Sequence, residues 1–334
     1  MTWIFGNARR DFLFLIAPGL LGILLSHWTL SHLNADFWLP IFGLIILGMI
    51  DSGHVYMTIW RTWLHPEERR SNTLYWVAPL AIFIVLIAWL QLGLPFLWTF
   101  TVYATIFHHI RQYYGIQRWY QRLNQQDLTA SGYFLYLLTF LPVIAFHFRE
   151  GMHAHYYTDH DIVFYPNPFL RNLFIALDVV CFIAWAIFEL RRWRQGFREW
   201  NRIGSIFFPA AMYALVFLKG ETAAEILFPL VLTHGIGYLG MMSLSLQRSR
   251  RQIFTNFMKA MFVLIVTAIA FGVFEFYAEL EWIDIDQNYI HGISLLETIL
   301  IGFYLTPLFC HYLFDAVIWK GNHREASLVY SLPP

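Results

Sequence analysis

The chain has very few cysteines and few charged side chains. Two of its 334 residues are cysteine, and Asp, Glu, Lys and Arg together make up 13%, against roughly 25% in soluble domains. Both cysteines, Cys181 and Cys310, lie inside apolar runs, which argues against a disulfide framework and against a CxxC metal site. The net charge is zero, so the chain shows no excess of basic residues for binding nucleic acid.

Apolar residues are abundant instead, with 58% of the chain hydrophobic and 19% aromatic. A soluble core cannot absorb that much apolar surface, whereas a bilayer can. A membrane span needs about 20 mainly apolar residues, and ten stretches meet this requirement. We therefore expect an all-α, polytopic integral membrane bundle that forms a single transmembrane domain over residues 1–334. The predicted spans are residues 12–33, 36–60, 74–92, 94–115, 131–148, 169–190, 203–219, 222–246, 254–278 and 292–319.

Basic residues are distributed very unevenly along this pattern. Only Arg149, Arg171 and Lys219 fall on one side of the ten predicted spans, which leaves 19 of the 22 Lys and Arg residues on the other side. The positive-inside rule makes the richer side cytoplasmic. Both termini are then cytoplasmic, and we expect the bacterial inner (cytoplasmic) membrane. The pair Arg9-Arg10 resembles a twin-arginine signal, but the following run is long and lacks a small-residue cleavage site, so a retained first helix is expected.

Fourteen histidines are unusual in so hydrophobic a chain. Five lie in predicted spans that run from outside to inside, about 6 to 12 residues from the inner end, which places them within about 10 Å of one another in depth. One buried histidine is explained by an interhelical hydrogen bond. Five at a matching depth favour a metal site, because ionisable groups inside a membrane are costly and usually functional. These residues are His54, His108, His109, His234 and His311.

Carboxylates accompany two of these histidines. Asp51 precedes His54 by three residues, and Asp315 follows His311 by four, so each pair shares one helix face. Each carboxylate can orient the imidazole through its second nitrogen or can itself bind the metal. Such ligands suit iron, zinc, copper or manganese, and we expect mononuclear or dinuclear iron. Adjacent residues point about 100° apart on a helix, so the choice between the two histidines at 108 and 109 stays open.

Other polar residues follow the same helix faces at helical spacings. They are predicted to surround the metal or to contact substrate, and they are Thr58, Arg61, Gln112 and Tyr238. For Arg61, near a helix end, contact with lipid head groups is an alternative. A second group of histidines lies in and before the longest predicted outer loop, where it indicates either an outer zinc or copper site or simply a solvated polar loop. This group is His147, His153, His155 and His160.

Four segments, residues 51–62, 108–115, 233–238 and 311–320, resemble signatures of a group of uncharacterised bacterial histidine-rich multi-span membrane proteins. They carry most of the residues just named. Membrane fatty-acid desaturases and hydroxylases are less similar, because residue 105 is Thr where an HxxHH box has His, and no HxxxH box is present.

In layout, the chain also resembles the Brp/Blh family of membrane β-carotene dioxygenases. That resemblance implies non-haem iron held by four histidines on different helices, here His54, one of His108 and His109, His234 and His311. The chain departs from that family in its ten predicted spans and in its Asp-x-x-His and His-His contexts.

The predicted function is a membrane-embedded metalloenzyme, a non-haem iron oxygenase or related oxidoreductase. A metal in the inner half of the bilayer is accessible from the lipid, so the expected partners are membrane lipids and a hydrophobic, lipid-like or isoprenoid substrate. Two alternatives are a haem or quinone redox protein with two histidine ligands and a transporter of metal ions or protons. Asp178, Glu275 and Glu297 favour transport, but they are scattered in depth.

Overall fold

The computed structural model describes residues 2–32, 35–126, 128–151, 161–248, 254, 256–282 and 294–319. These residues form helices and no strand, which confirms the all-α class. Within this part of the chain, eight helical stretches are long and apolar enough to cross a membrane, or nine if one bent pair counts as a single span. The count of ten spans and the cytoplasmic termini stay predictions.

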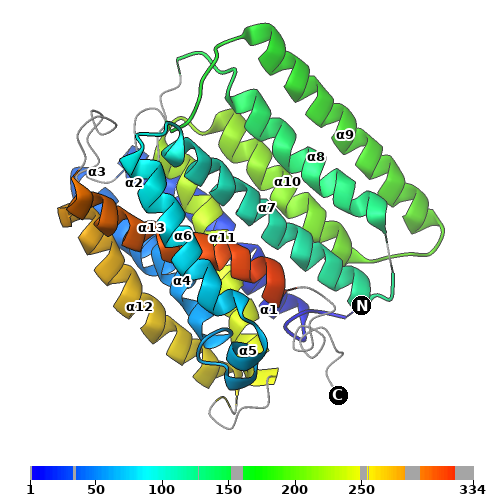
Figure 1. The fold of residues 1–334 in the computed structure, drawn as a ribbon. Coiled ribbons are helices and arrows are strands. Elements are labelled where there is room, and N and C mark those ends of the chain that lie inside the picture. The colour runs from blue at the N-terminus through cyan, green and yellow to red at the C-terminus, as the bar shows by residue number, and fades with distance from the viewer. Residues whose placement is uncertain are drawn as a thin grey trace. The chain divides into compact units, whose positions relative to one another are not determined.

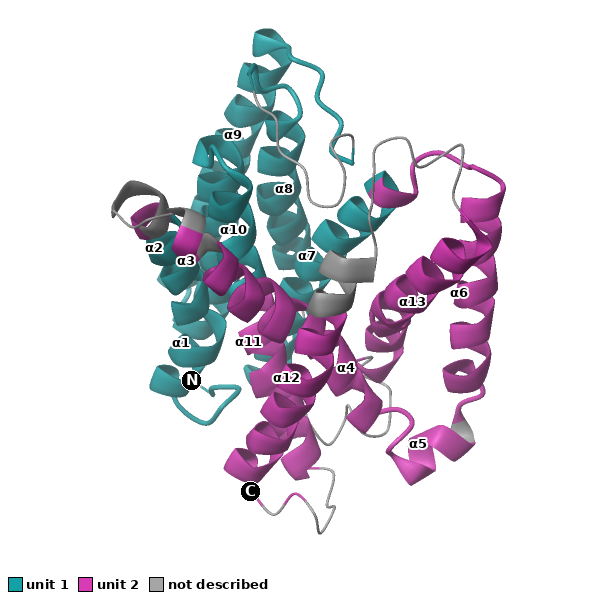
Figure 2. Ribbon diagram, turned by 90° about the vertical axis from the view of Figure 1, so that its left-hand side faces the viewer, with its two compact units in different colours: residues 1–26, 99–233, 332–334 teal, residues 27–98, 234–331 magenta. Residues whose placement is uncertain are grey.

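The chain divides into two compact units (Figure 2). Of the described residues, unit 1 comprises 2–26 and 99–233, and unit 2 comprises 27–98 and 234–319. Three helices contribute residues to both units. They are α2 (Ala17–His32), α7 (Leu97–Leu123) and α11 (Ala223–Arg248). The prediction of one transmembrane domain is not tested by this division.

The first predicted span is broken into α1 (Ala8–Leu15) and α2, with a bend of about 40° between them. Asn7 caps α1 by accepting a hydrogen bond from the backbone N–H of Arg10 at 2.9 Å. The break at Ile16 lies two residues before Pro18. A proline has no N–H to donate and crowds the preceding turn, which accounts for the bend.

The second predicted span is not a regular α-helix. It consists of α3 (Ala35–Gly43), the π-helix η1 (Leu44–Ser52), α4 (Gly53–Met57) and the 3-10 helix η2 (Thr58–Trp60). The N–H of Gly53 donates to the carbonyl of Gly48, five residues back, as a π-helix requires. Such distortions occur frequently at functional sites, and this one directly precedes His54.

The fourth predicted span, residues 94–115, is part of α7, which continues to Leu123. Although α7 has 27 residues, it is not among the stretches apolar enough to cross a membrane. The reason is its polar composition, since His108, His109, Arg111 and Gln112 follow one another within little more than a turn.

Three long helices of unit 1 lie side by side, with α8 (Thr129–Phe146) packed against both α9 (Pro168–Arg194) and α10 (Trp200–Lys219) (Figure 1). A buried ionic network joins α9 to α10. Arg202 is fully buried and donates to Glu189, which it contacts through both terminal nitrogens, and to Glu199 at 2.8 Å. Because each charge has an opposite partner, the cost of burying the guanidinium group is offset.

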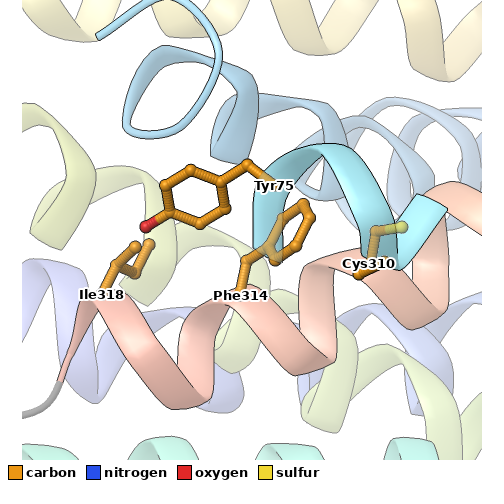
Figure 3. Close-up of a cluster of buried hydrophobic side chains, with 5 residues drawn as sticks. Tyr75, Cys310, Phe314 and Ile318 are labelled. Atoms are coloured by element: carbon orange, nitrogen blue, oxygen red, sulfur yellow. The ribbon is translucent and has the colours of Figure 1, made fainter. Parts of the chain in front are cut away.

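Unit 2 contains α5 (Pro66–Ser71), α6 (Leu74–Gln91), α12 (Phe257–Trp282) and α13 (Leu295–Ile318). Tyr75 of α6 packs against Cys310, Phe314 and Ile318, which lie along one face of α13 (Figure 3). Cys310 is thus part of an apolar cluster, in agreement with a packing role. This contact holds α13, and with it His311, against α6.

Glycines allow other helices to approach the distorted segment very closely. A Cβ atom on Gly272 of α12 would lie 2.3 Å from the carbonyl oxygen of Gly48 and 2.8 Å from the Cα of Gly53. A Cβ atom on Gly235 of α11 would lie 2.6 Å from Ile50. Neither position has room for a Cβ atom, so both require glycine. The close contacts fix the backbone next to His54 and next to His234.

Candidate metal centre

Three of the predicted ligands come together inside unit 2. His54 lies on α4, His234 on α11 and His311 on α13, and all three side chains are buried. Each offers a nitrogen, and these nitrogens lie within 4.8 Å of one another. The imidazole centroids of His54 and His311 are 4.8 Å apart, and those of His54 and His234 are 4.6 Å apart. Three helices distant in sequence thus bring imidazoles to one point.

The tautomer of His54 follows from its backbone partner. Its Nδ1 atom lies 3.1 Å from the carbonyl oxygen of Ile50. A carbonyl only accepts hydrogen bonds, so Nδ1 carries the proton, and Nε2 carries the lone pair. Ile50 is the seventh residue of the π-helix, so the distorted segment itself provides the acceptor that orients this ring.

The tautomer of His311 follows from a hydrogen-bonded chain that ends at a carboxylate. The hydroxyl of Tyr238 donates to Asp315 Oδ1 at 2.9 Å. Its oxygen is then available to accept from the hydroxyl of Thr58 at 2.9 Å, and Thr58 in turn accepts from Nδ1 of His311 at 2.7 Å. Because Nδ1 is the donor, Nε2 of His311 carries the lone pair. Hydrogen bonds of this kind hold metal-binding imidazoles in place.

The donor set fits a metal ion. Nε2 of His234 lies 2.9 Å from Nε2 of His54. Because Nε2 of His54 carries the lone pair, this spacing allows either a hydrogen bond donated by Nε2–H of His234 or, when both nitrogens are deprotonated, a shared cation. Bonds of about 2.0–2.1 Å from nitrogen to a metal separate two ligand nitrogens by about 2.9 Å at a right angle and by about 3.3 Å at the tetrahedral angle. The observed spacing is at the short end of this range.

The two carboxylates that accompany the histidines differ in position. Asp315 Oδ2 lies 3.8 Å from Nε2 of His311, and its other oxygen accepts from Tyr238. Asp51 Oδ1 lies 3.9 Å from Nδ1 of His54, farther than the carbonyl of Ile50. Sequence spacing placed Asp51 on the correct helix face, but it did not identify the carbonyl of Ile50 as the nearer acceptor.

Of the other predicted neighbours, Thr58 and Tyr238 both belong to the hydrogen-bonded chain described above. Arg61 is fully buried in unit 2, with its guanidinium carbon 5.8 Å from the ring centroid of Trp319, so it does not extend to lipid head groups. Gln112 is half-buried on α7, in unit 1.

His108 and His109 also lie on α7, in unit 1, and both are buried. Their part in the metal site belongs to the proposal below. His65 caps α5 by accepting from the backbone N–H of Glu68.

Only one member of the possible second metal site lies in the described chain. Nδ1 of His147 is 2.7 Å from the carbonyl oxygen of Val163 and 3.4 Å from the hydroxyl of Tyr103. This places the ring in a hydrogen-bonded setting between α8 and the segment that leads into α9. His153, His155 and His160 lie outside the described residues.

No family model, curated protein or solved structure matches the chain. The interpretation of this centre therefore depends on its geometry.

Proposed function

We propose that the protein is a membrane-embedded metalloprotein whose metal ion is held by four histidines, His54, His108, His234 and His311. The observation that carries the proposal is the buried cluster of three imidazoles in unit 2. The fourth proposed ligand is His108, a buried histidine of α7 in unit 1. In this proposal His109, which points away from His108 on the same helix, is a neighbour and not a ligand.

The proposed ion is mononuclear iron. Neutral imidazoles with a nearby carboxylate are ligands for iron, and the nitrogens of the cluster are close enough to share one ion. Iron would supply redox chemistry with molecular oxygen. Asp315 and Asp51 lie beyond the imidazoles, where they balance the charge of the cation. Zinc, copper and manganese fit the same donors, so metal identity is part of the test.

The proposed activity is oxidation of a lipid-like or isoprenoid substrate. Eight helical stretches of the described chain are apolar enough to lie in a membrane, and three of them carry His54, His234 and His311. A hydrophobic molecule dissolved in the membrane is therefore the substrate that can reach the site most directly. The layout that resembles membrane β-carotene dioxygenases gives a first candidate, an isoprenoid polyene. The residues of this chain would hold the metal, orient its ligands through Thr58 and Tyr238, and exclude bulk water.

The first test is the metal content of the purified protein, measured by elemental analysis after expression in iron-supplemented medium. We expect about one iron per chain, and its loss in His311→Ala. His65→Ala is the matched control, because His65 is also a buried histidine of unit 2 but caps a helix instead. A metal-free wild-type protein of unchanged stability, or equal iron in both variants, would contradict the proposal.

The second test separates the proposed activity from the alternatives. The iron-loaded protein in detergent is incubated with β-carotene and oxygen, and products are followed by chromatography. Cleavage that disappears in His311→Ala supports an oxygenase. A Soret absorption band would instead indicate haem, and metal or proton uptake into proteoliposomes without turnover would indicate a transporter.

A further inference from the structure

Unit 1 contains a cavity of about 280 Å³ that no part of the proposed metal chemistry uses. It lies between α1, α7 and α10. Small residues create the space, namely Ala8 on α1 and Gly204 and Ser205 on α10. A Cβ atom on Gly204 would meet only the ring of Phe208, at 3.4 Å. Phe12 and Trp200, which also line the cavity, are 44% and 55% exposed, so the cavity opens at the surface of the unit.

One carboxylate lies in the wall of this cavity, and among the described lining residues no Lys, Arg or His accompanies it. Asp11 is 3% exposed. It accepts hydrogen bonds from the backbone N–H groups of Ile4 at 3.0 Å and Phe5 at 2.8 Å, and from the hydroxyl of Tyr120. A carboxylate has about four acceptor positions, so three donors leave capacity for one more.

The polar groups beside Asp11 accept as well. The hydroxyl proton of Tyr120 is donated to Asp11, and that of Ser205 is donated to the carbonyl of Arg202 at 2.7 Å. Both oxygens retain lone pairs. A ligand that brings hydrogen-bond donors can use these lone pairs, and a cation is favoured because it also balances the buried negative charge.

Aromatic rings form much of the remaining wall, and their faces attract cations. They are Trp3, Phe12, Tyr113, Tyr120, Trp200 and Phe208. Aromatic rings combined with a carboxylate are the usual chemistry for recognising an ammonium group. A phosphate or carboxylate ligand would instead be repelled by Asp11.

Two exposed arginines indicate what else the ligand carries. Arg9 and Arg10 directly follow Ala8 on α1 and are both exposed. They can meet an anionic group that stays outside the cavity while a cation enters it. In the predicted topology this end of α1 is cytoplasmic, at the level of lipid head groups.

We propose that this cavity binds the primary ammonium group of a zwitterionic membrane phospholipid of the phosphatidylethanolamine type. The ammonium group lies against Asp11 and the aromatic rings, the phosphate faces Arg9 and Arg10, and the acyl chains continue over the exposed ring of Phe12. The site is a lipid-binding site in unit 1, and it does not depend on the metal centre.

Native mass spectrometry of the full chain in detergent tests this proposal, with phosphatidylethanolamine and phosphatidylglycerol of identical acyl chains as probes. We expect wild-type protein to retain phosphatidylethanolamine at least about tenfold better. Gly204→Leu fills the cavity and should abolish that preference. Gly115→Leu on α7 is the matched control, because a Cβ atom there meets nothing within 4 Å and Gly115 does not line the cavity.

Asp11→Asn should reduce the preference as well, because it removes the charge that attracts the ammonium group. If that variant does not fold, the comparison of Gly204→Leu with Gly115→Leu still decides. Equal retention of the two lipids by wild-type protein, or unchanged preference in Gly204→Leu, would overturn the proposal. Iron content should be the same in all variants, so failure here is distinguishable from failure of the proposed metal site.

Discussion

Replacing Thr58 with valine changes one hydroxyl to a methyl group at the centre of the hydrogen-bonded chain beside the metal site. Thr58 is 2% exposed and contacts both His311 Nδ1 and the hydroxyl of Tyr238. Valine has nearly the same shape, so packing is preserved. The Nδ1 proton of His311 loses its acceptor, and the ring loses the contact that fixes its orientation.

The expected magnitude follows from these contacts. Loss of a hydrogen-bond partner of a metal-binding imidazole typically weakens metal affinity by about 10- to 100-fold, equivalent to about 1.4–2.7 kcal/mol. Tyr238 keeps its bond to Asp315, so we expect the effect of Thr58→Val to lie toward the lower limit. Thr58→Ser retains the hydroxyl and should bind metal within about threefold of wild type.

Competition with a chelator of known affinity measures the change, with bound metal quantified after removal of the chelator complex. Thr139→Val is the matched control, because Thr139 is a fully buried threonine of unit 1 whose hydroxyl donates only to backbone carbonyls of its own helix. Equal affinities in Thr58→Val, Thr58→Ser and the control would refute the orienting role assigned to Thr58.

Two further substitutions test the packing inside each unit. Arg202→Met removes the cation that contacts the buried carboxylate of Glu189, while Glu199 keeps Arg192 at 3.5 Å. It should lower the free energy of unfolding in detergent by about 3–5 kcal/mol, measured by denaturant titration. Glu221→Gln, at an exposed carboxylate, should change it by less than about 0.5 kcal/mol. Gly272→Leu forces a side chain against the carbonyl of Gly48 and should lower both thermal stability and metal content. Gly43→Leu is the control, because a Cβ atom there meets nothing within 4 Å, and it should change neither thermal stability nor metal content. Unchanged metal content in Gly272→Leu would show that the close contact between Gly272 and Gly48 is not needed for the site.

The helical spacing of the ligands could be predicted from the sequence because it depends on one helix at a time. Tyr238 lies one turn after His234, and Asp315 lies one turn after His311. In both cases, regular α-helix carries the pair to the same face, and the structure places both pairs at the cluster. Apolar runs likewise predict most helices to within a few residues.

Features that depend on the meeting of two helices could not be predicted in this way. One acidic partner of Arg202, Glu189, lies on a different helix. From the sequence alone, Arg202 was therefore only one of the basic residues on the cytoplasmic side of the predicted spans. The cavity beside Asp11 arises because Ala8 and Gly204 are small where their helices meet. The sequence pattern of each helix does not reveal that Ala8 and Gly204 line the same cavity.

The π-helix before His54 explains how the site is built from an apparently ordinary apolar segment. The backbone N–H of Gly53 contacts both the carbonyl of Gly48, five residues back, and the carbonyl of Ile50. A carbonyl has two lone pairs, so that of Ile50 can also accept from Nδ1 of His54, which lies 3.1 Å away. A carbonyl near the end of the π-helix thus fixes the tautomer of His54. Gly272 and Gly235 let α12 and α11 pack against the widened turn, which holds it in this geometry.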